Sequence, residues 1–172
     1  VYDDNGCDFF QEFDVTVSGS VTPSISGIAS AYCANAPAVT PTLQPVGGTL
    51  SGPGVAGGVF TPANVPSNLH GQTLTLTYSG GGGSCPYSTT VQVVVRALPV
   101  LGGNASPASC GTCADGSIAA TATGGSGSGY QFRLGTGTPQ ASGNFSGLLP
   151  GDYTVTLTDG NSCETSLLYQ VG

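Results

Sequence analysis

The chain has 172 residues and a formal net charge of −7, and only 6% of its residues are charged, against about 25% in a typical soluble domain. Arg96 and Arg133 are the only lysine or arginine residues. This composition argues against binding to nucleic acid, because such proteins neutralise phosphates with clustered basic side chains. No apolar run reaches the length of a membrane span, and the sequence contains no signal peptide.

Residues 1–19 predict the terminal hairpin of a preceding unit. Apolar and polar residues alternate toward the end of this segment, which is the period of a half-buried strand. Asp3, Asp4 and Asp8 form a weak candidate calcium site, because calcium prefers several carboxylate and carbonyl oxygens. The alternative is a polar turn in which Asp and Asn side chains bond the backbone.

Residues 20–97 predict an immunoglobulin-like sandwich. Short runs with a period of two are separated by Gly-, Pro-, Asn- and Ser-rich turns, which is typical of this architecture. The clearest runs are Leu74-Leu76-Tyr78 and Val91-Val93-Val95. Threonine occupies the outward positions in TLTLTY, which suits a strand face exposed to water.

Residues 98–172 predict a second sandwich with the same patterning. The alternating runs are Ile118-Ala120-Ala122, Tyr130-Phe132-Leu134, Tyr153-Val155-Leu157 and Leu167-Tyr169-Val171. Tyr153 follows a Leu-Pro-Gly turn at the start of the penultimate strand, where immunoglobulin-like folds place a tyrosine corner. The predicted fold class is therefore all-β, with tandem immunoglobulin-like β-sandwich domains.

The cysteines show that the two units are repeats. Cys7, Cys85 and Cys163 each follow a predicted hairpin turn, and the differences 85 − 7 and 163 − 85 both equal 78. Cys33 and Cys110 form a second series, since 110 − 33 equals 77. A fixed period of this length indicates a tandem array. Each unit is small, and small extracellular domains commonly gain stability from disulfides.

The spacing predicts one disulfide within each unit. Cys33 would pair with Cys85 and Cys110 with Cys163, so that an early strand is linked to the last hairpin in both units. Cys113 is an alternative partner for Cys163, and the sequence does not decide between it and Cys110. Such bonds require an oxidising compartment, which predicts an extracellular protein.

Two cysteines remain outside this scheme. Cys7 would find its partner outside the chain, in an upstream segment or in another copy. Cys110 and Cys113 form a C-x-x-C motif, which is found in redox and zinc sites. Zinc requires four ligands, and the only histidine lies in the other unit. A structural disulfide or a spare thiol is therefore the preferred interpretation.

The sequence does not predict an enzyme. His70 has no acidic residue in its own unit to orient it, so a Ser-His-Asp arrangement is not expected and His70 is interpreted as a loop residue. The glycine runs SGGGGS and GGSGSG are followed by neither a lysine nor a helix, so they are interpreted as loops rather than phosphate sites. We expect no catalytic residue, no cofactor and no bound metal other than the calcium candidate.

Specific motifs of the second unit resemble a known family. CGTCADGSIAATATGGSGSGYQFRL and NFSGLLPGDYTVTLTDGNSC resemble the SprB-type repeat of gliding-motility adhesins of Bacteroidota. In the first unit, GGTLSGPGVAGGVFTPANV and TLTLTYSGGGGSC resemble immunoglobulin-like repeats of large secreted surface proteins from the same bacteria. The resemblance implies type 9 secretion and a role in surface adhesins or filaments.

The predicted function is structural or adhesive: a repeat segment of a long extracellular surface adhesin or filament at the cell surface. The expected partners are neighbouring repeats or copies, because the almost uncharged first unit lacks the charges that block edge-to-edge pairing of strands. One alternative is a glycan-binding module that uses Tyr32, Tyr87 or Tyr130. Another is a protomer of a polymer built by strand donation, with an interchain bond at Cys7.

Overall fold

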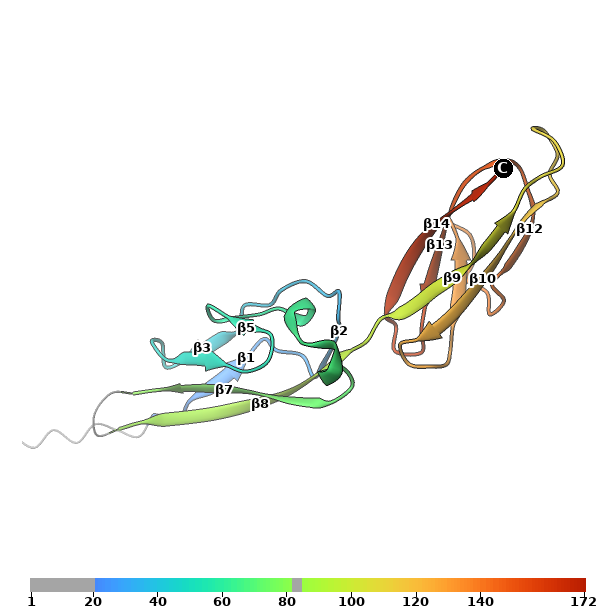
Figure 1. Cartoon of the computed structure of the whole chain (residues 1–172). Coiled ribbons are helices and arrows are strands. Elements are labelled where there is room, and N and C mark those ends of the chain that lie inside the picture. The colour runs from blue at the N-terminus through green and yellow to red at the C-terminus, as the bar shows by residue number, and fades with distance from the viewer. Residues whose placement is uncertain (1–20, 82–84) are drawn as a thin grey trace, which may run out of the picture.

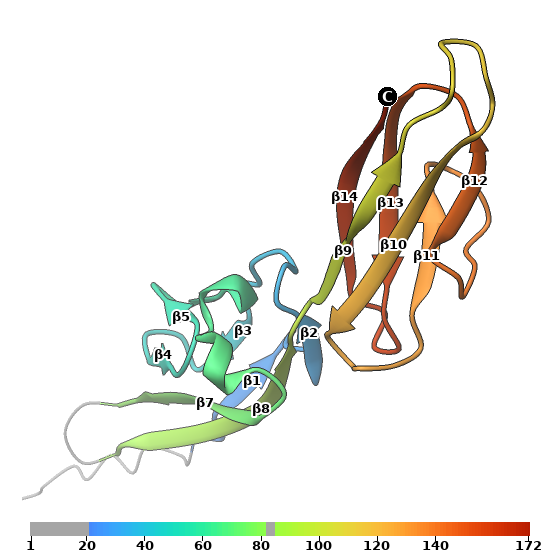
Figure 2. The same cartoon turned by 45° about the vertical axis from the view of Figure 1, so that its right-hand side comes forward.

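The computed structural model describes residues 21–81 and 85–172. Figure 1 shows two β-sandwiches arranged end to end and joined by the backbone between strands β8 and β9. The same arrangement is seen after rotation in Figure 2. The predicted fold class, all-β with tandem immunoglobulin-like sandwiches, is confirmed. The strands of the predicted hairpin in residues 1–19, and the candidate calcium ligands Asp3, Asp4 and Asp8, lie outside the described residues.

Within residues 21–81 and 85–97, the first sandwich contains eight strands and two short 3-10 helices. Their bounds are β1 Ser24–Ser26, β2 Ala31–Cys33, β3 Thr42–Gln44, β4 Thr49–Ser51, β5 Val55–Ala56, β6 Val59–Phe60, η1 Pro62–Asn64, η2 Ser67–Leu69, β7 Thr73–Gly80 and β8 Tyr87–Arg96. One sheet has the order β2-β8-β7-β4, and β1-β3 and β5-β6 form two small sheets. Strand β2 runs parallel to β8, whereas β7 and β8 form an antiparallel hairpin.

The core of the first sandwich follows the predicted alternation. Leu74, Leu76 and Tyr78 of β7 are buried, and the threonines between them point outward or are only half-buried. On β8, Val93 and Val95 are buried while Val91 is partly buried. The Tyr78 hydroxyl accepts a hydrogen bond from Gly48 N at 2.9 Å and donates one to the Pro45 carbonyl. The hydroxyl of this buried tyrosine is thus hydrogen-bonded, as burial requires.

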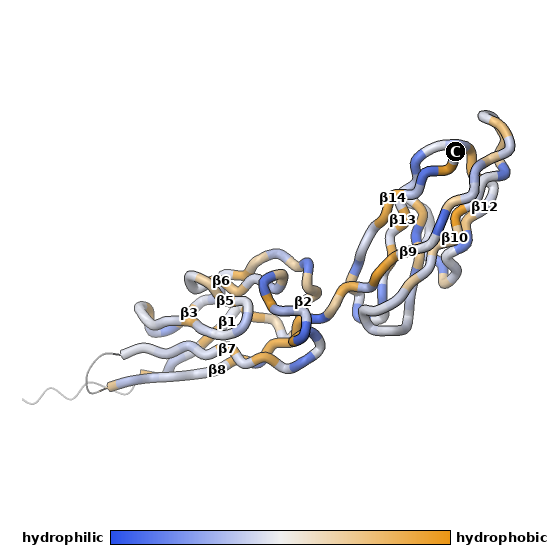
Figure 3. Tube along the Cα trace, viewed as in Figure 1, coloured by the Kyte–Doolittle hydropathy of each residue, from blue (hydrophilic) through white to orange (hydrophobic). Residues whose placement is uncertain are grey.

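The second sandwich consists of six strands in two sheets. Their bounds are β9 Pro99–Ser106, β10 Gly116–Gly124, β11 Gln131–Leu134, β12 Asn144–Leu148, β13 Gly151–Thr158 and β14 Glu164–Val171. The sheet orders are β12-β10-β9 and β11-β13-β14. Figure 3 shows hydrophobic and hydrophilic stretches alternating along these strands. The buried core residues include Ile118, Phe132, Val155, Leu157 and Tyr169.

The predicted tyrosine corner is present in the second sandwich. The Tyr153 hydroxyl donates a hydrogen bond to the Leu149 carbonyl, four residues upstream, at 3.0 Å. This bond fixes the turn that leads into β13, as in other immunoglobulin-like folds. One predicted core position differs: Leu167 on β14 is 41% exposed, because it lies near the start of the strand, beyond the buried positions Tyr169 and Val171.

Candidate functional site

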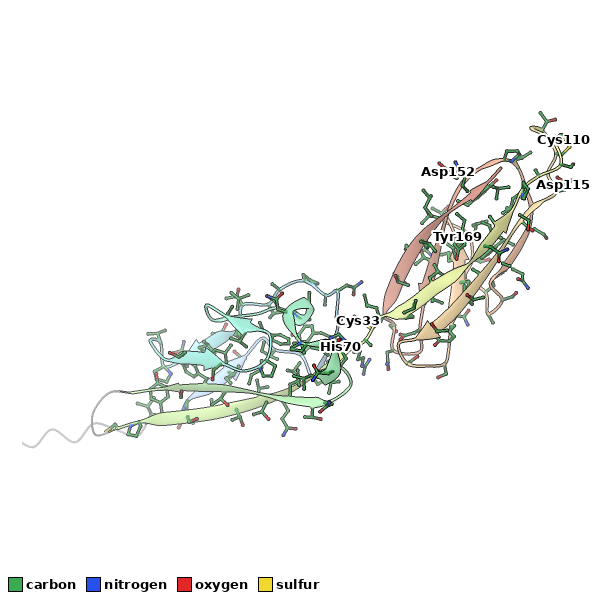
Figure 4. The ribbon with its side chains drawn as sticks, in the orientation of Figure 1. Cys33, His70, Cys110, Asp115, Asp152 and Tyr169 are labelled. Atoms are coloured by element: carbon green, nitrogen blue, oxygen red, sulfur yellow. A yellow bond between two sulfur atoms is a disulfide. The ribbon has the colours of Figure 1, made fainter. Side chains whose placement is uncertain are left out.

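The candidate site is the junction between the two sandwiches, which we define as Cys33, Asn35, Arg96 and the β13–β14 turn with Cys163. Only two residues, Ala97 and Leu98, separate β8 from β9. Because β2 is parallel to β8, Cys33 lies opposite Arg96, at the end where the chain leaves the first sandwich. In Figure 4, Cys33 and His70 lie at this end of the first sandwich.

A disulfide bond joins the sandwiches at this junction. Cys33 of β2 is bonded to Cys163, which immediately precedes β14, with a Cα–Cα distance of 5.5 Å. The two cysteines are 130 positions apart in the sequence. In the chain-entropy treatment, closing a loop of this size stabilises the folded state by about 5 kcal/mol. Cys163 has no exposed surface, so the sulfur that this residue contributes to the inter-sandwich disulfide is shielded from solvent.

Two hydrogen bonds accompany the inter-sandwich disulfide. Asn35 Nδ2 donates to the Glu164 carbonyl at 3.1 Å, and Arg96 donates through a guanidinium nitrogen to the Asn161 carbonyl at 3.3 Å. Both acceptors are backbone carbonyls of the second sandwich. The contacts therefore depend on the shape of the β13–β14 turn more than on its side chains. A neutral hydrogen bond such as that of Asn35 is worth about 0.5–1.5 kcal/mol net, and one with a charged donor such as Arg96 is worth somewhat more.

Asp159 holds the turn that presents Cys163. Its side chain is only 4% exposed. Oδ1 accepts hydrogen bonds from the backbone nitrogens of Asn161 and Cys163, both at 2.9 Å. Oδ2 accepts one from Ser126 N, in the β10–β11 loop, at 2.7 Å. Hydrogen bonds to a carboxylate are stronger than neutral ones, so a single side chain fixes the turn and ties it to the adjacent loop.

Gly125 makes this arrangement possible. Its φ is +58°, and a Cβ at this position would lie 2.4 Å from Asp159 Oδ2. Any side chain at residue 125 would thus both strain the backbone and displace the carboxylate. The glycine run GGSGSG, interpreted as a loop from the sequence, forms most of the β10–β11 loop, in which Ser126 N donates a hydrogen bond to the Asp159 carboxylate.

The predicted disulfide pairs, Cys33 with Cys85 and Cys110 with Cys163, are wrong. Strand β8 has ten residues and begins just after Cys85, so Cys85 and the end of β8 opposite Cys33 are separated by roughly 30 Å at 3.3 Å per residue. Cys110 lies likewise beyond the far end of β9, whereas Cys163 lies beside its beginning. Cys33 and Cys85 thus lie at opposite ends of the first sandwich, and Cys110 and Cys163 at opposite ends of the second. The end of the second sandwich that carries Cys163 faces the end of the first that carries Cys33.

Cys110 bonds to Cys113 instead, with a Cα–Cα distance of 5.0 Å. This short loop lies at the tip of the second sandwich far from the junction (Figure 4). Ser109 N donates to Asp115 Oδ1 at 2.8 Å across the loop. Hydrogen bonds from the side chain and backbone of Ser109 lower the pKa of Asp115. Cys85 is exposed and has no disulfide partner among the described residues.

The repeat relation between the cysteines is nevertheless visible in the backbone. Ala34 N, next to Cys33, donates to the carbonyl of Arg96 at the end of β8. In the second sandwich, Ala108 N, two residues before Cys110, donates to the carbonyl of Gly172 just after β14. Cys33 and Cys110 thus occupy corresponding ends of the two sandwiches, as Cys85 and Cys163 occupy corresponding hairpins.

The other candidate residues have structural contacts. His70 directly follows η2, and its Nε2 lies 3.2 Å from the Val65 carbonyl. Tyr32 packs edge-on against Phe60, with ring centroids 5.6 Å apart, and its hydroxyl accepts a hydrogen bond from Ala29 N. Tyr130 packs against the second core and donates to the Gly124 carbonyl.

Tyr87 packs against the first core beside Tyr78. Its pKa is raised, chiefly by the side-chain hydrogen bond with Tyr78. Within residues 21–81 and 85–172 no group of three or more His, Cys, Asp or Glu side chains is arranged to hold a metal ion. No helix in these ranges is long and apolar enough to cross a membrane.

No protein-family model matches the sequence, and no curated protein matches it. Among solved structures, the chain is similar to the crystal structure of the insect immune protein hemolin, described as a domain arrangement with implications for homophilic adhesion. The identity is 13%, the TM-score is 0.40, and the match covers 91% of this chain and 48% of hemolin. The chain therefore spans about half the length of that structure. The strand topology and tyrosine corner define the chain as a tandem immunoglobulin-like β-sandwich protein.

Proposed function

We propose that the chain is a repeat segment of a long extracellular surface adhesin or filament, in which units 20–97 and 98–172 are successive repeats. The observation that supports this most directly is the Cys33–Cys163 bond, which joins consecutive sandwiches rather than closing either one. This disulfide sets the spacing and orientation of the two repeats relative to each other. Disulfides also fit an extracellular protein, because they form and persist in oxidising compartments.

The motifs that resemble SprB-type repeats have a structural role that supports the same proposal. The turn DGNSC of the second unit contains Asp159 and Cys163, and Asp159 orients the cysteine that reaches the preceding sandwich. In this proposal the motif is a device for linking repeats. The resemblance further supports type 9 secretion and a role in gliding motility. The proposal includes no catalytic step.

The proposal is tested on cells of the organism that makes the protein. Antibodies raised against residues 21–172 should label intact cells, and their Fab fragments should reduce attachment to surfaces. Labelling that appears only after permeabilisation would contradict a surface location. The reduced, denatured mass of the native protein provides a second readout, because a mass far above 16.8 kDa is expected of a long repeat protein.

Assembly by strand addition is a second candidate, favoured by the outer edge of β8. Strand β2 pairs with β8 only at Val94–Arg96, so the edge along residues 87–93 has no strand partner in the described part of the chain. No charged side chain interrupts this edge, and such edges accept extended strands. Thr90→Lys should abolish self-association of the chain in sedimentation experiments. A monodisperse wild-type monomer at high concentration would contradict this candidate.

A glycan-binding function is less well supported. Tyr32, Tyr87 and Tyr130, the aromatic residues considered for it, all pack against one of the two cores. A sugar site normally requires an aromatic face that is open beside polar groups. Binding on a glycan array that is lost on Tyr130→Ala but kept on Tyr130→Phe would reinstate this function.

A further inference from the structure

The inter-sandwich disulfide creates a covalent route that bypasses most of the chain. From the N-terminal side the backbone passes through β1 and β2 to Cys33, and from Cys163 it passes through β14 to Gly172. The residues between the two cysteines, 34–162, form a closed loop attached at this bond. They include β3 to β13 and most of both cores.

We propose that the Cys33–Cys163 bond transmits tension past both sandwiches, so that a pulling force is borne by residues 21–33, the disulfide and residues 163–172. The loop 34–162 bears no tension while the bond is intact. Both sandwiches therefore remain folded at forces that would unfold a chain without this bond. The inference concerns the mechanics of the chain and goes beyond the proposed function, because it does not depend on what the chain binds.

The C-terminal part of this route is already extended. Strand β14 is held by the disulfide at its beginning and would be pulled from its end, so tension runs along the strand itself. A strand rises 3.2–3.4 Å per residue, close to the 3.3–3.6 Å of a fully stretched chain. Its eight residues pair with β13, and the Tyr169 hydroxyl donates to the Gly102 carbonyl on β9. Stretching therefore gains almost no length and leaves these contacts in place.

The N-terminal part of the route is short and packed. Strand β1 pairs with β3, strand β2 pairs with β8, and the bend at residues 27–30 lies between them. Ile25, Ile28 and Tyr32 pack against the first core. Straightening this bend is the only sizeable extension that the intact chain can undergo along the described part of the route.

The junction protects the bond that bears the load. Cys163 is fully buried, and Asp159 fixes its backbone nitrogen. Two hydrogen bonds also cross the junction close to the disulfide. Asn35 donates to the carbonyl of Glu164, next to Cys163, and Arg96 donates to the carbonyl of Asn161. A thiol breaks a disulfide by attacking one of its sulfurs, so a reductant has to approach from the side of Cys33, which is only partly buried.

Single-molecule force spectroscopy on the whole chain, attached by its two ends, tests the inference. Every variant also has Cys7→Ser and Cys85→Ser, so that the thiols cannot exchange. With both disulfides intact, the unfolding events should together lengthen the described part of the route by less than roughly 80 Å. This limit is the fully stretched length of residues 21–33 and 163–172. Cys33→Ser/Cys163→Ser should release an additional 430–470 Å or so, from the 130 positions that the bond encloses.

Two comparisons make the outcome decisive. The matched control Cys110→Ser/Cys113→Ser removes a disulfide that encloses only three positions, and its release should equal that of the parent. If Cys33→Ser/Cys163→Ser does not fold, the parent is measured in dithiothreitol, where each long release should follow reduction of one bond under load. Long releases from the oxidised parent without reductant would overturn the inference. So would an unchanged release from the reduced chain.

Discussion

Asp159 and Ser126 are joined across the second sandwich by a 2.7 Å hydrogen bond from the Ser126 backbone nitrogen to the buried Asp159 carboxylate. The same carboxylate accepts the backbone nitrogen of Cys163. The position of the cysteine that reaches the first sandwich therefore depends on a loop more than thirty residues earlier in the chain. This relationship links the folding of the second sandwich to the formation of the junction.

Asp159→Asn should destabilise the second sandwich by about 1–3 kcal/mol. An amide retains one acceptor oxygen, but its NH2 group would face the Ser126 N–H, and an unsatisfied buried donor costs this amount. Urea unfolding of the whole chain measures the change. Asp152→Asn is the matched control, because Asp152 is exposed and surface substitutions usually change stability by less than about 0.5 kcal/mol. Equal effects of the two substitutions would show that the hydrogen bonds to Asp159 do not stabilise the second sandwich.

The strands and the tyrosine corner could be predicted from the sequence because their signals are local. The alternation Leu74-Leu76-Tyr78 defines a buried face within six residues, and the Leu-Pro-Gly turn marks Tyr153 as a corner. The role of Asp159 could not be predicted, because its partner Ser126 lies in a glycine-rich loop with no pattern of its own. The sequence predicts a hairpin turn before Cys163, but the burial of the Asp159 carboxylate in that turn depends on tertiary contacts.

The disulfide pairing could not be predicted from the period alone, because a period defines equivalent positions and not the end of the sandwich at which each lies. The deciding feature is the parallel pairing of β2 with β8, which sets Cys33 opposite Arg96 and away from Cys85. This pairing joins strands that lie far apart in the sequence, so no local pattern reveals it.

The disulfide, and not the two hydrogen bonds beside it, should fix how the sandwiches move relative to one another. Asn35→Ala/Arg96→Ala removes both hydrogen bonds but keeps the covalent link, so the two sandwiches should still tumble as one body in ¹⁵N relaxation measurements. Cys33→Ser/Cys163→Ser should give each sandwich a shorter rotational correlation time. Independent tumbling in the first variant would assign the rigidity of the junction to the hydrogen bonds.

The loop closed by Cys110 and Cys113 should respond to acid through Asp115. Hydrogen bonds from Ser109 hold the pKa of Asp115 below its ordinary value of 3.8. The bonded, ionised form is therefore complete above that value, and it is lost as the pH falls through the lowered pKa. The amide resonance of Ser109 should report this titration in NMR spectra. Asp115→Asn should abolish it, and a Ser109 titration that persists in that variant would assign the effect to another group.

The two arginines allow the disulfide pairing to be tested with a single protease. Trypsin cleaves after Arg96 and Arg133 only, because the chain has no lysine, and it yields fragments 1–96, 97–133 and 134–172. The Cys33–Cys163 and Cys110–Cys113 bonds predict that fragment 1–96 is linked to 134–172 while 97–133 is released. Digestion without reductant, after alkylation of free thiols at low pH to prevent exchange, followed by mass spectrometry, measures this.

Pairing within each unit would give the opposite result in the same experiment. Bonds between Cys33 and Cys85 and between Cys110 and Cys163 would release fragment 1–96 and link 97–133 to 134–172. The alkylated thiols provide an internal check, since Cys85 is exposed and should be modified in the folded chain, whereas Cys163 should not. The proposed path of tension and the proposed array both depend on the inter-sandwich bond. A linked 97–133 fragment would therefore remove the physical basis of both.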